Sequence, residues 1–266
     1  MSKDKWKLVT EMPVLKYKCG LKAGDFVRLK KDIVVRDHKG QPTGKIHQAH
    51  EIWKVVNGSK EKPIVVWLLQ SDGKRHTWHD DSSIFDWFEL VEEEIFDIVN
   101  ERDEVIGQAP RKEVHARELW HRAVHVLVFN ARGEVFLQKR SMLKDTAKGK
   151  WDSSSSGHLD TGEDYDACAV REVREEIGLE LAATGASLPL QRLFKIDACQ
   201  ETGWEFCWIY RCESEGPFVL HPDEIETGAW FAPDAVTKWV NEKPHDFASA
   251  FVLIWKTLIT TNPKTV

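Results

Sequence analysis

Residues 157–179 read GHLDTGEDYDACAVREVREEIGL, and this stretch decides how the second part of the chain folds. We expect a helix over residues 164–177, because Gly162 and Glu163 break the chain before it and Gly178 stops it. Its apolar side chains fall on one arc about 120° wide, which is expected to pack on a β-sheet. These side chains are Ala167, Val170, Val173 and Ile177.

The nearly opposite arc of this helix carries three carboxylates, Glu172, Glu175 and Glu176. Side chains spaced three and four residues apart have Cβ atoms only about 5–6 Å from one another, so these negative charges repel. One interpretation is a solvated acidic face supported by an Arg171–Glu175 pair. The other is a site for hard divalent cations, which prefer carboxylate oxygens and suit phosphate chemistry.

The fixed residues of this stretch follow the order Gly, five residues, Glu, seven residues, Arg-Glu, aliphatic, any, Glu-Glu, any, Gly, aliphatic. This order resembles the signature of the Nudix hydrolase family at every fixed position. The resemblance implies hydrolysis of a diphosphate linkage in a nucleoside diphosphate derivative or a related organic pyrophosphate, with Mg²⁺ or Mn²⁺ as cofactor. It implies Glu172 and Glu176 as the main metal ligands, assisted by Glu175 and the Gly157 carbonyl. Arg171 would orient these carboxylates by pairing with Glu175.

Positive side chains precede the helix in a strand and polar loop that are expected to face it. Arg140 and Lys144 are the residues that we expect to contact the phosphates of the substrate. Lys148 and Lys150 in the same loop are as consistent with a solvated basic loop as with a role in the site.

Two carboxylates outside the helix are candidates for the base that accepts a proton from water. Glu205 interrupts an otherwise apolar strand, as a side chain pointing into a site would do, and it is our preferred candidate. Glu224 lies in a loop of the kind that supplies the base in many relatives, but an exposed loop acid is the simpler interpretation.

Outside the signature, the chain resembles the branch of the family that includes isopentenyl-diphosphate isomerase. Residues 97–107 and the histidines at 115, 121 and 158 carry this resemblance. In the isomerase, histidines matching His115, His121 and His158 help to bind a metal, so His158 is a candidate ligand here and the three together are a candidate second site. Packing or hydrogen bonding is the alternative role for each of them.

The position of Ser156 favours a hydrolase over an isomerase. The isomerases have an essential cysteine there, and a serine hydroxyl titrates far above a thiol, so it is no direct replacement. The isomerases also have a degenerate signature, whereas the signature is complete here. An isomerase-like enzyme and a non-catalytic sensor of diphosphates stay as alternatives to a pyrophosphohydrolase.

The remaining pattern of the second part is that of an α/β protein. We expect a hairpin, further strands and two helices, which gives an α/β/α sandwich around a mixed sheet. The hairpin covers residues 95–99 and 105–108, the strands residues 124–129, 135–139, 193–196, 204–212, 218–220 and 229–231, and the helices residues 233–241 and 247–261.

The first ninety residues differ from the rest in charge and in pattern. Up to Val91 there are 17 Lys and Arg against 12 Asp and Glu, whereas the remainder has 20 against 31. Short β-branched runs separated by turns such as Asn57-Gly58 and Ser71-Asp72-Gly73 predict a small SH3-like barrel of about five strands. Four tryptophans in these runs are expected to fill its core. We therefore expect two domains, residues 1–91 and residues 92–266.

Composition sets limits on partners and location. The net charge of −6 and the lack of a strongly basic domain argue against nucleic-acid binding as the main task. Apolar runs are far shorter than the roughly 20 residues of a membrane span. The first residues are charged and no apolar core follows them, so we do not expect export through a signal peptide. Five cysteines without a CxxC pair indicate reduced thiols. We expect a cytoplasmic enzyme that acts on a small molecule, with a homodimer as the default assembly.

Overall fold

The structure is a computed structural model that describes residues 16–56, 65–70, 73–181 and 190–261. The chain divides into two compact units, Met1–Glu93 and Glu94–Val266. The turns expected at Asn57-Gly58 and Ser71-Asp72 lie outside the described residues, as does the N-terminal stretch tested for a signal peptide.

The N-terminal unit is built on a five-stranded antiparallel sheet with the order β6-β5-β4-β1-β7. Its strands are β1 (Phe26–Leu29), β4 (Ile52–Val56), β5 (Val65–Leu69), β6 (Arg75–His79) and β7 (Phe88–Val91), with η1 (Ser82–Asp86) before β7. A separate two-stranded ribbon consists of β2 (Ile33–Arg36) and β3 (Pro42–His47). Of the four tryptophans, Trp53 lies in the core, Trp78 and Trp87 pack at its edge, and Trp67 is half-buried outside it.

The C-terminal unit contains a seven-stranded mixed sheet. The strand order is β12-β11-β10-β15-β14, with β13 paired to β10 and β16 paired to β11. Only β10 and β15 run parallel, and the other pairs in this sheet are antiparallel. The strands are β10 (His121–Phe129), β11 (Val135–Arg140), β12 (Trp151–Asp152), β13 (Ser155–His158), β14 (Gln191–Ile196), β15 (Glu205–Glu213) and β16 (Ile225–Phe231).

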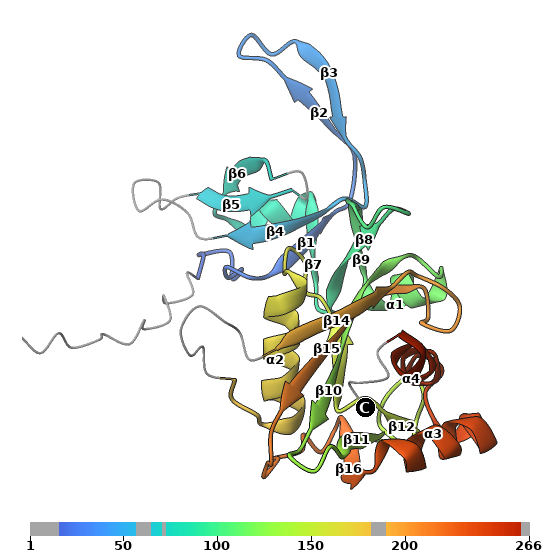
Figure 1. Cartoon of the computed structure of the whole chain (residues 1–266). Helices are drawn as coiled ribbons and strands as arrows, with labels where there is room; N and C mark the ends of the chain where they lie inside the picture. Colours follow the sequence, from blue (N-terminus) through green and yellow to red (C-terminus); the bar gives the residue numbers. More distant parts are fainter. Residues whose placement is uncertain (1–15, 57–64, 71–72, 182–189, 262–266) are drawn as a thin grey trace, which may run out of the picture. The chain divides into compact units, whose positions relative to one another are not determined.

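Helices cover both faces of this sheet (Figure 1). Along β10 the side chains alternate, so that Leu127 and Phe129 pack towards α3 and α4, while Val126 and Val128 pack towards α2. The helices are α1 (Arg111–Ala116), α2 (Tyr165–Ile177), α3 (Pro233–Glu242) and α4 (Ser249–Thr261), with η2 (Pro244–Asp246) before α4, and the hairpin is β8 (Ile95–Val99) with β9 (Val105–Pro110). The predicted α/β/α sandwich with a mixed sheet is confirmed.

Several local predictions differ from the structure. Residues 218–220 are not a strand, because the chain there passes the end of α2, where Val219 N donates to Ile177 O. Helix α4 begins at Ser249 and not at Phe247, because Phe247 forms an isolated β-bridge with Trp151. The runs predicted as strands in the N-terminal part, residues 26–29, 33–35, 51–56, 64–69 and 76–78, do not include β3 and β7. Helix α1 and the short strands β12 and β13 were not predicted either.

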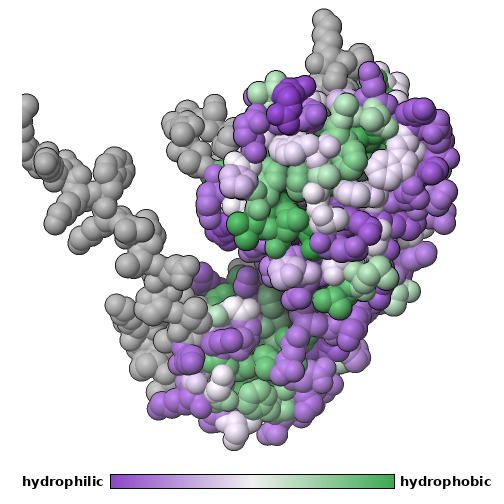
Figure 2. Space-filling view, turned by 90° about the horizontal axis from the view of Figure 1, so that it is seen from below, coloured by the Kyte–Doolittle hydropathy of each residue, from purple (hydrophilic) through white to green (hydrophobic). Residues whose placement is uncertain are grey.

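The surface is mainly hydrophilic on the face that Figure 2 shows, with apolar residues in smaller patches between the polar ones. In the C-terminal unit, the most exposed large apolar side chains that the structure describes include Leu143 and Val219, at 72% and 74%. Among the described residues, no helix has both the length and the apolar character that crossing a membrane requires.

Candidate functional site

Helix α2 begins and ends where its local sequence dictates. The Asp164 side chain caps its first turn by accepting from Ala167 N at 2.9 Å, and Gly178 ends it with φ +66°, a conformation that favours glycine. The buried face is rotated from the expected arc, since Ala167 is exposed. The side chains that pack on the sheet are Cys168, Ala169, Val173 and Ile177, with Val170 partly buried.

Glu176 is the most buried of the three carboxylates, at 4% exposure. Its Oε2 accepts hydrogen bonds from Ser156 N at 2.9 Å and from Gln138 Nε2 at 3.0 Å. Glu176 is therefore covered by Gln138 of β11 and Ser156 of β13, a burial that its predicted place opposite the apolar arc did not indicate. Burial raises the pKa of Glu176 to about 7.

The carboxylate of Glu172 lies against Gly157, which follows Ser156 in strand β13. A Cβ atom at position 157 would lie 2.1 Å from the Cδ of Glu172, so only glycine leaves space for this carboxylate. Burial, and secondly the charge of Glu176, raise the pKa of Glu172 to about 8. Glu172 and Glu176 are thus neighbouring carboxylates, four residues apart on α2, whose negative charges are poorly compensated by positive groups of the protein.

Arg171 connects the carboxylates of the signature. It donates to both oxygens of Glu163 at 2.9 and 2.8 Å, to Glu172 at 2.6 Å and to Glu175 at 3.2 Å. It also donates to the His158 carbonyl at 3.0 Å, which fixes the loop before the helix. Arg171 therefore pairs with Glu175 as expected, but its bidentate partner is Glu163, and Glu175 is 49% exposed.

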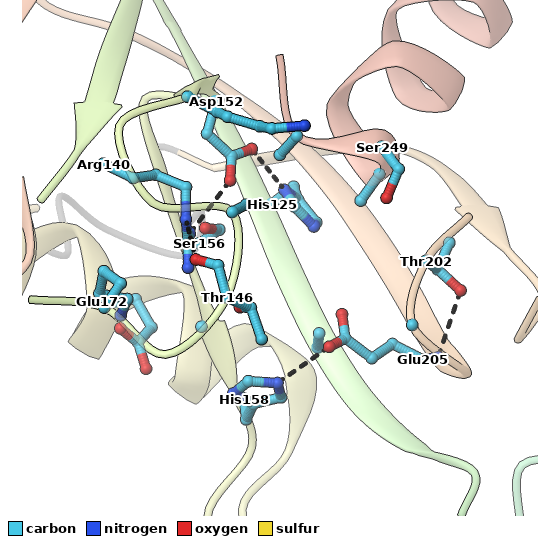
Figure 3. Close-up of a pocket in the computed structure, with 18 of the residues that line it drawn as sticks. His125, Arg140, Thr146, Asp152, Ser156, His158, Glu172, Thr202, Glu205 and Ser249 are labelled. Carbon is cyan, nitrogen blue, oxygen red and sulfur yellow. Dashed lines mark hydrogen bonds and ion pairs between the residues drawn. The ribbon is translucent and has the colours of Figure 1, made fainter. Parts of the chain in front are cut away.

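These groups line one cavity of about 1140 Å³ in the C-terminal unit. All the residues that the sequence predicted for the site border it, together with Ser156 and Glu224. Figure 3 shows Glu172, His158 and Glu205 directed into the same space from α2, β13 and β15. The predicted residues are Gly157, His158, Arg171, Glu172, Glu175, Glu176, Arg140, Lys144 and Glu205.

The two expected phosphate contacts are both paired with carboxylates. Arg140 Nη1 donates to Asp152 Oδ2 at 3.1 Å, and the Lys144 ammonium forms an ion pair with Glu224. Their charges are thus largely balanced within the protein.

Three histidines meet beside the cavity, where His115 and His158 border it and His121 is buried at 1% exposure. His115 comes from α1, His121 from β10 and His158 from β13, and each offers a ring nitrogen within 4.8 Å of the others. Glu205 Oε1 lies 2.9 Å from His158 Nε2 and 3.5 Å from His121 Nε2. The buried Nε2 atoms of His115 and His121 have no hydrogen-bond partner among the described residues. Buried nitrogens without partners are costly unless a further group binds them.

The electrostatics around these histidines differ from those at α2. The neighbouring histidines hold the pKa of Glu205 well below its usual range despite burial, so the carboxylate is ionised. Burial lowers the pKa of His158 to about 4, which keeps its ring neutral. A neutral imidazole and an ionised carboxylate are the forms that bind metal ions.

The sequence analysis missed one polar group on the cavity floor. His125 is buried, with Nδ1 3.0 Å from Ser153 Oγ and 3.8 Å from Asp152 Oδ1 (Figure 3). A signal was present, because His121 and His125 are i and i+4 in a strand whose remaining residues, apart from Arg122, are apolar, and both therefore point to one face.

Comparisons with known proteins agree with this geometry. Residues 119–251 match the model of the NUDIX domain. An uncharacterized Nudix hydrolase of Yersinia pestis is 34% identical over 165 residues, which are 60% of this chain and 85% of the relative. Uncharacterized Nudix hydrolase YfcD of Escherichia coli K12 is 33% identical over 171 residues, 63% of this chain and 89% of the relative. The crystal structure of DR0079 from Deinococcus radiodurans superposes with a TM-score of 0.50 at 29% identity and covers 56% of this chain and 90% of that one. The chain is therefore an enzyme of the Nudix hydrolase family.

Proposed function

We propose that this enzyme cleaves a diphosphate linkage in a nucleoside diphosphate derivative or a related organic pyrophosphate, with Mg²⁺ or Mn²⁺ held by Glu172 and Glu176. The observation that carries the proposal is the pair of carboxylates Glu172 and Glu176 beside a cavity, where burial raises their pKa values to about 8 and about 7, so that their ionised forms need a bound cation. A divalent cation is the group that compensates such a pair and also binds phosphate oxygens.

The residues at this end of the cavity fit a hard cation. Glu172 and Glu176 supply carboxylate oxygens, and Glu175 is 49% exposed. Gly157 lacks a side chain, so the Glu172 carboxylate lies against its backbone, whose carbonyl would be a further ligand. When bound, the metal would polarise a phosphoryl oxygen and lower the pKa of the attacking water. Arg171 keeps Glu172 and Glu175 oriented through its hydrogen bonds.

The remaining chemistry is assigned to side chains around the cavity. Glu205 is ionised and partly buried, and it is the residue that we propose as proton acceptor from water. Glu224 is engaged by Lys144, which makes it the less suitable base. Arg140 and Lys144 would face the diphosphate, with their charges shared between the substrate and their carboxylate partners.

The histidine cluster supports a second metal site made of His115, His121, His158 and Glu205. The buried Nε2 atoms of His115 and His121 lack hydrogen-bond partners among the described residues, and His121 Nε2 lies 3.5 Å from Glu205 Oε1, which favours this set. If it binds a metal, Glu205 acts as a ligand and no longer as the base. Metal analysis of the purified protein and of a His121→Ala variant decides this, since only a histidine site loses metal on this change.

The same histidines favour an isomerase-like enzyme as the second candidate function. Against it stand Ser156, which has no thiol, and the complete carboxylate set of α2. Isomerisation of isopentenyl diphosphate by the wild-type protein, or a gain of that activity in Ser156→Cys, would support this candidate. A non-catalytic sensor would bind diphosphates and release no product with any divalent metal.

The test is product release from a panel of nucleoside triphosphates, nucleotide sugars, dinucleoside polyphosphates, coenzyme A and isoprenoid diphosphates, with Mg²⁺ or Mn²⁺. Glu176→Gln is the blank, and Glu213→Gln is the matched control, because Glu213 is an exposed carboxylate at the end of β15. We expect one class to be cleaved by the wild type and the control, but not by the blank. Equal cleavage by the blank would contradict the metal assignment.

We further propose that residues 1–91 and 92–266 are separate domains and that the first is an SH3-like barrel. The division into compact units at Glu93 and the five-stranded antiparallel sheet support this view. The free state of all five cysteines supports a cytoplasmic location. A homodimer is the assembly to test by light scattering.

A further inference from the structure

Asp97 is a buried carboxylate that the proposed chemistry does not use. It lies in β8 and is 7% exposed. Its Oδ1 accepts from Gln108 Nε2 of β9 at 3.2 Å, and its Oδ2 accepts from Gly162 N at 3.0 Å. Both donors are uncharged groups. Burying a carboxylate is costly, so the hydrogen bonds that it makes are expected to fix something in the structure.

Gly162 belongs to the turn at residues 160–163, which leads into α2. In the same turn, the Thr161 hydroxyl donates to the Ile95 carbonyl at 2.9 Å, so hydrogen bonds from two adjacent residues join the turn to the hairpin of β8 and β9. Gly162 adopts φ +77°, and glycine is the residue with the greatest backbone freedom. The hairpin precedes residues 119–251, which match the NUDIX domain, and it therefore supports the turn from outside the matched region.

The turn carries Glu163, which sets the position of Arg171. The Glu163 side chain is folded back on the turn, because its Oε2 accepts from Asp160 N at 3.1 Å. Arg171 donates to both oxygens of Glu163, and such a bidentate pair fixes the plane of the guanidinium group. The same guanidinium donates to Glu172 at 2.6 Å. A displacement of the turn would therefore also displace the carboxylate of Glu172.

We propose that Asp97 is a positioning residue for the proposed metal site. It holds Gly162 in place, and with it the turn from which Glu163 directs Arg171 towards Glu172. The inference rests on the proposed function, because it concerns the same carboxylates of α2.

The first measurement follows the link from Asp97 to the turn in chelator, without any metal. Hydrogen–deuterium exchange of the full chain is read by mass spectrometry on short peptides that include Gly162. Asp97→Ala should exchange about tenfold faster there, the factor that corresponds to the loss of one hydrogen bond to a charged group. Asp97→Asn should exchange like the wild type, because asparagine keeps an oxygen for Gly162 N and the Gln108 amide can turn its own oxygen towards the new NH₂ group.

The second measurement is Mn²⁺ binding followed by electron paramagnetic resonance, which needs no substrate. Loss of the groups that orient metal ligands typically weakens binding about 10–100-fold, and Asp97 acts through several such groups, so we expect about tenfold weaker binding in Asp97→Ala. Asp97→Asn should keep the wild-type affinity, although it lacks the negative charge. Recovery in Asp97→Asn separates the hydrogen bond from the charge.

Asp103→Asn is the matched control for a loss of stability. Asp103 is a second carboxylate of the same hairpin, and its side chain is 11% exposed. It accepts from Arg122 Nε and Lys195 Nζ, both at 2.5 Å, and from the Tyr165 hydroxyl at 2.9 Å. These partners lie outside the turn at 160–163. Asp103→Asn should therefore lower the melting temperature but leave both the exchange of the turn and the Mn²⁺ affinity unchanged.

Three results would overturn the inference. The first is unchanged exchange of the turn in Asp97→Ala, and the second is faster exchange with an unchanged Mn²⁺ affinity. The third is an equal loss of affinity in Asp97→Ala and in either Asp97→Asn or Asp103→Asn, which would assign the effect to charge or to overall stability.

Thr161→Val is the second variant, and it decides the question if Asp97→Ala does not fold. It removes the hydrogen bond to the Ile95 carbonyl with little change in side-chain volume. We expect faster exchange of the turn and weaker Mn²⁺ binding, and wild-type behaviour in both would overturn the inference. In each negative case, weaker Mn²⁺ binding in Glu176→Gln would leave the proposed function standing. A wild type that binds no Mn²⁺ would defeat the proposed function and the inference together.

Discussion

Gly157 offers the most direct structural test of the site, because Gly157→Ala introduces a single methyl group next to Glu172. The new Cβ atom would lie 2.1 Å from Glu172 Cδ and 2.2 and 2.5 Å from its oxygens, whereas Cβ contacts under 3.0 Å are essentially never found. The carboxylate must therefore retreat by about 1 Å, and a misplacement of about 1 Å in a catalytic group typically lowers the rate about 100-fold. This corresponds to about 2.7 kcal/mol of transition-state stabilisation.

The assay is kcat/KM on the substrate found in the panel, together with a Mg²⁺ titration of the rate. Gly107→Ala is the matched control, because Gly107 also lies in a strand with ordinary backbone angles and its new Cβ atom would meet only Ile98 Cδ1, at 4.0 Å. We expect Gly157→Ala to melt close to the wild type, since the end of the Glu172 side chain moves into the cavity and not into the core. A Gly157→Ala enzyme within about threefold of wild-type kcat/KM would refute this reasoning.

Three further predictions concern stability. With a chelator present, the melting temperature should fall from pH 6 to pH 9. The pKa values of Glu172 and Glu176 are raised to about 8 and about 7, so the folded protein favours their protonated forms and loses this stabilisation as the pH rises through these values. Excess Mg²⁺ should restore stability at pH 9, and a flat or rising melting temperature in chelator would contradict the metal assignment. Arg171→Lys should lower the free energy of unfolding, measured in urea, by about 3 kcal/mol, because Glu163 loses its bidentate partner. A change of less than about 0.5 kcal/mol, as is typical of surface substitutions, would contradict this structural role of Arg171. Gly178→Ala should cost at least about 1–2 kcal/mol in the same assay, because φ is +66° and the new Cβ atom would lie 2.9 Å from Val219 Cβ, while kcat of the folded fraction stays unchanged.

Those parts of the fold that depend on local sequence were predictable. Helix α2 was found nearly to the residue, because the Asp164 cap and the Gly178 stop act on their immediate neighbours. Strand β3 escaped prediction because its residues lack alternation, and only His47 among them is buried. Such a strand forms because it pairs with β2, and this pairing cannot be read from the sequence of either segment by itself.

The candidate site was predictable in its residues and less so in its electrostatics. Helical periodicity gave the direction of Glu176 but not the cover that Ser156 and Gln138 supply from two strands, and so its burial was missed. The prediction that Lys144 contacts phosphate did not include its ion pair with Glu224, which lies 80 residues away in the sequence. Contacts between residues so far apart in the sequence depend on the tertiary fold, which sequence periodicity does not reveal.

Mn²⁺ binding followed by electron paramagnetic resonance tests most directly whether Glu172 and Glu176 hold a divalent metal. The titration needs no substrate and compares the wild type with Glu176→Gln and with the exposed control Glu213→Gln. We predict at least about tenfold weaker binding in Glu176→Gln and unchanged binding in the control. Equal Mn²⁺ affinity in all three proteins would contradict the account.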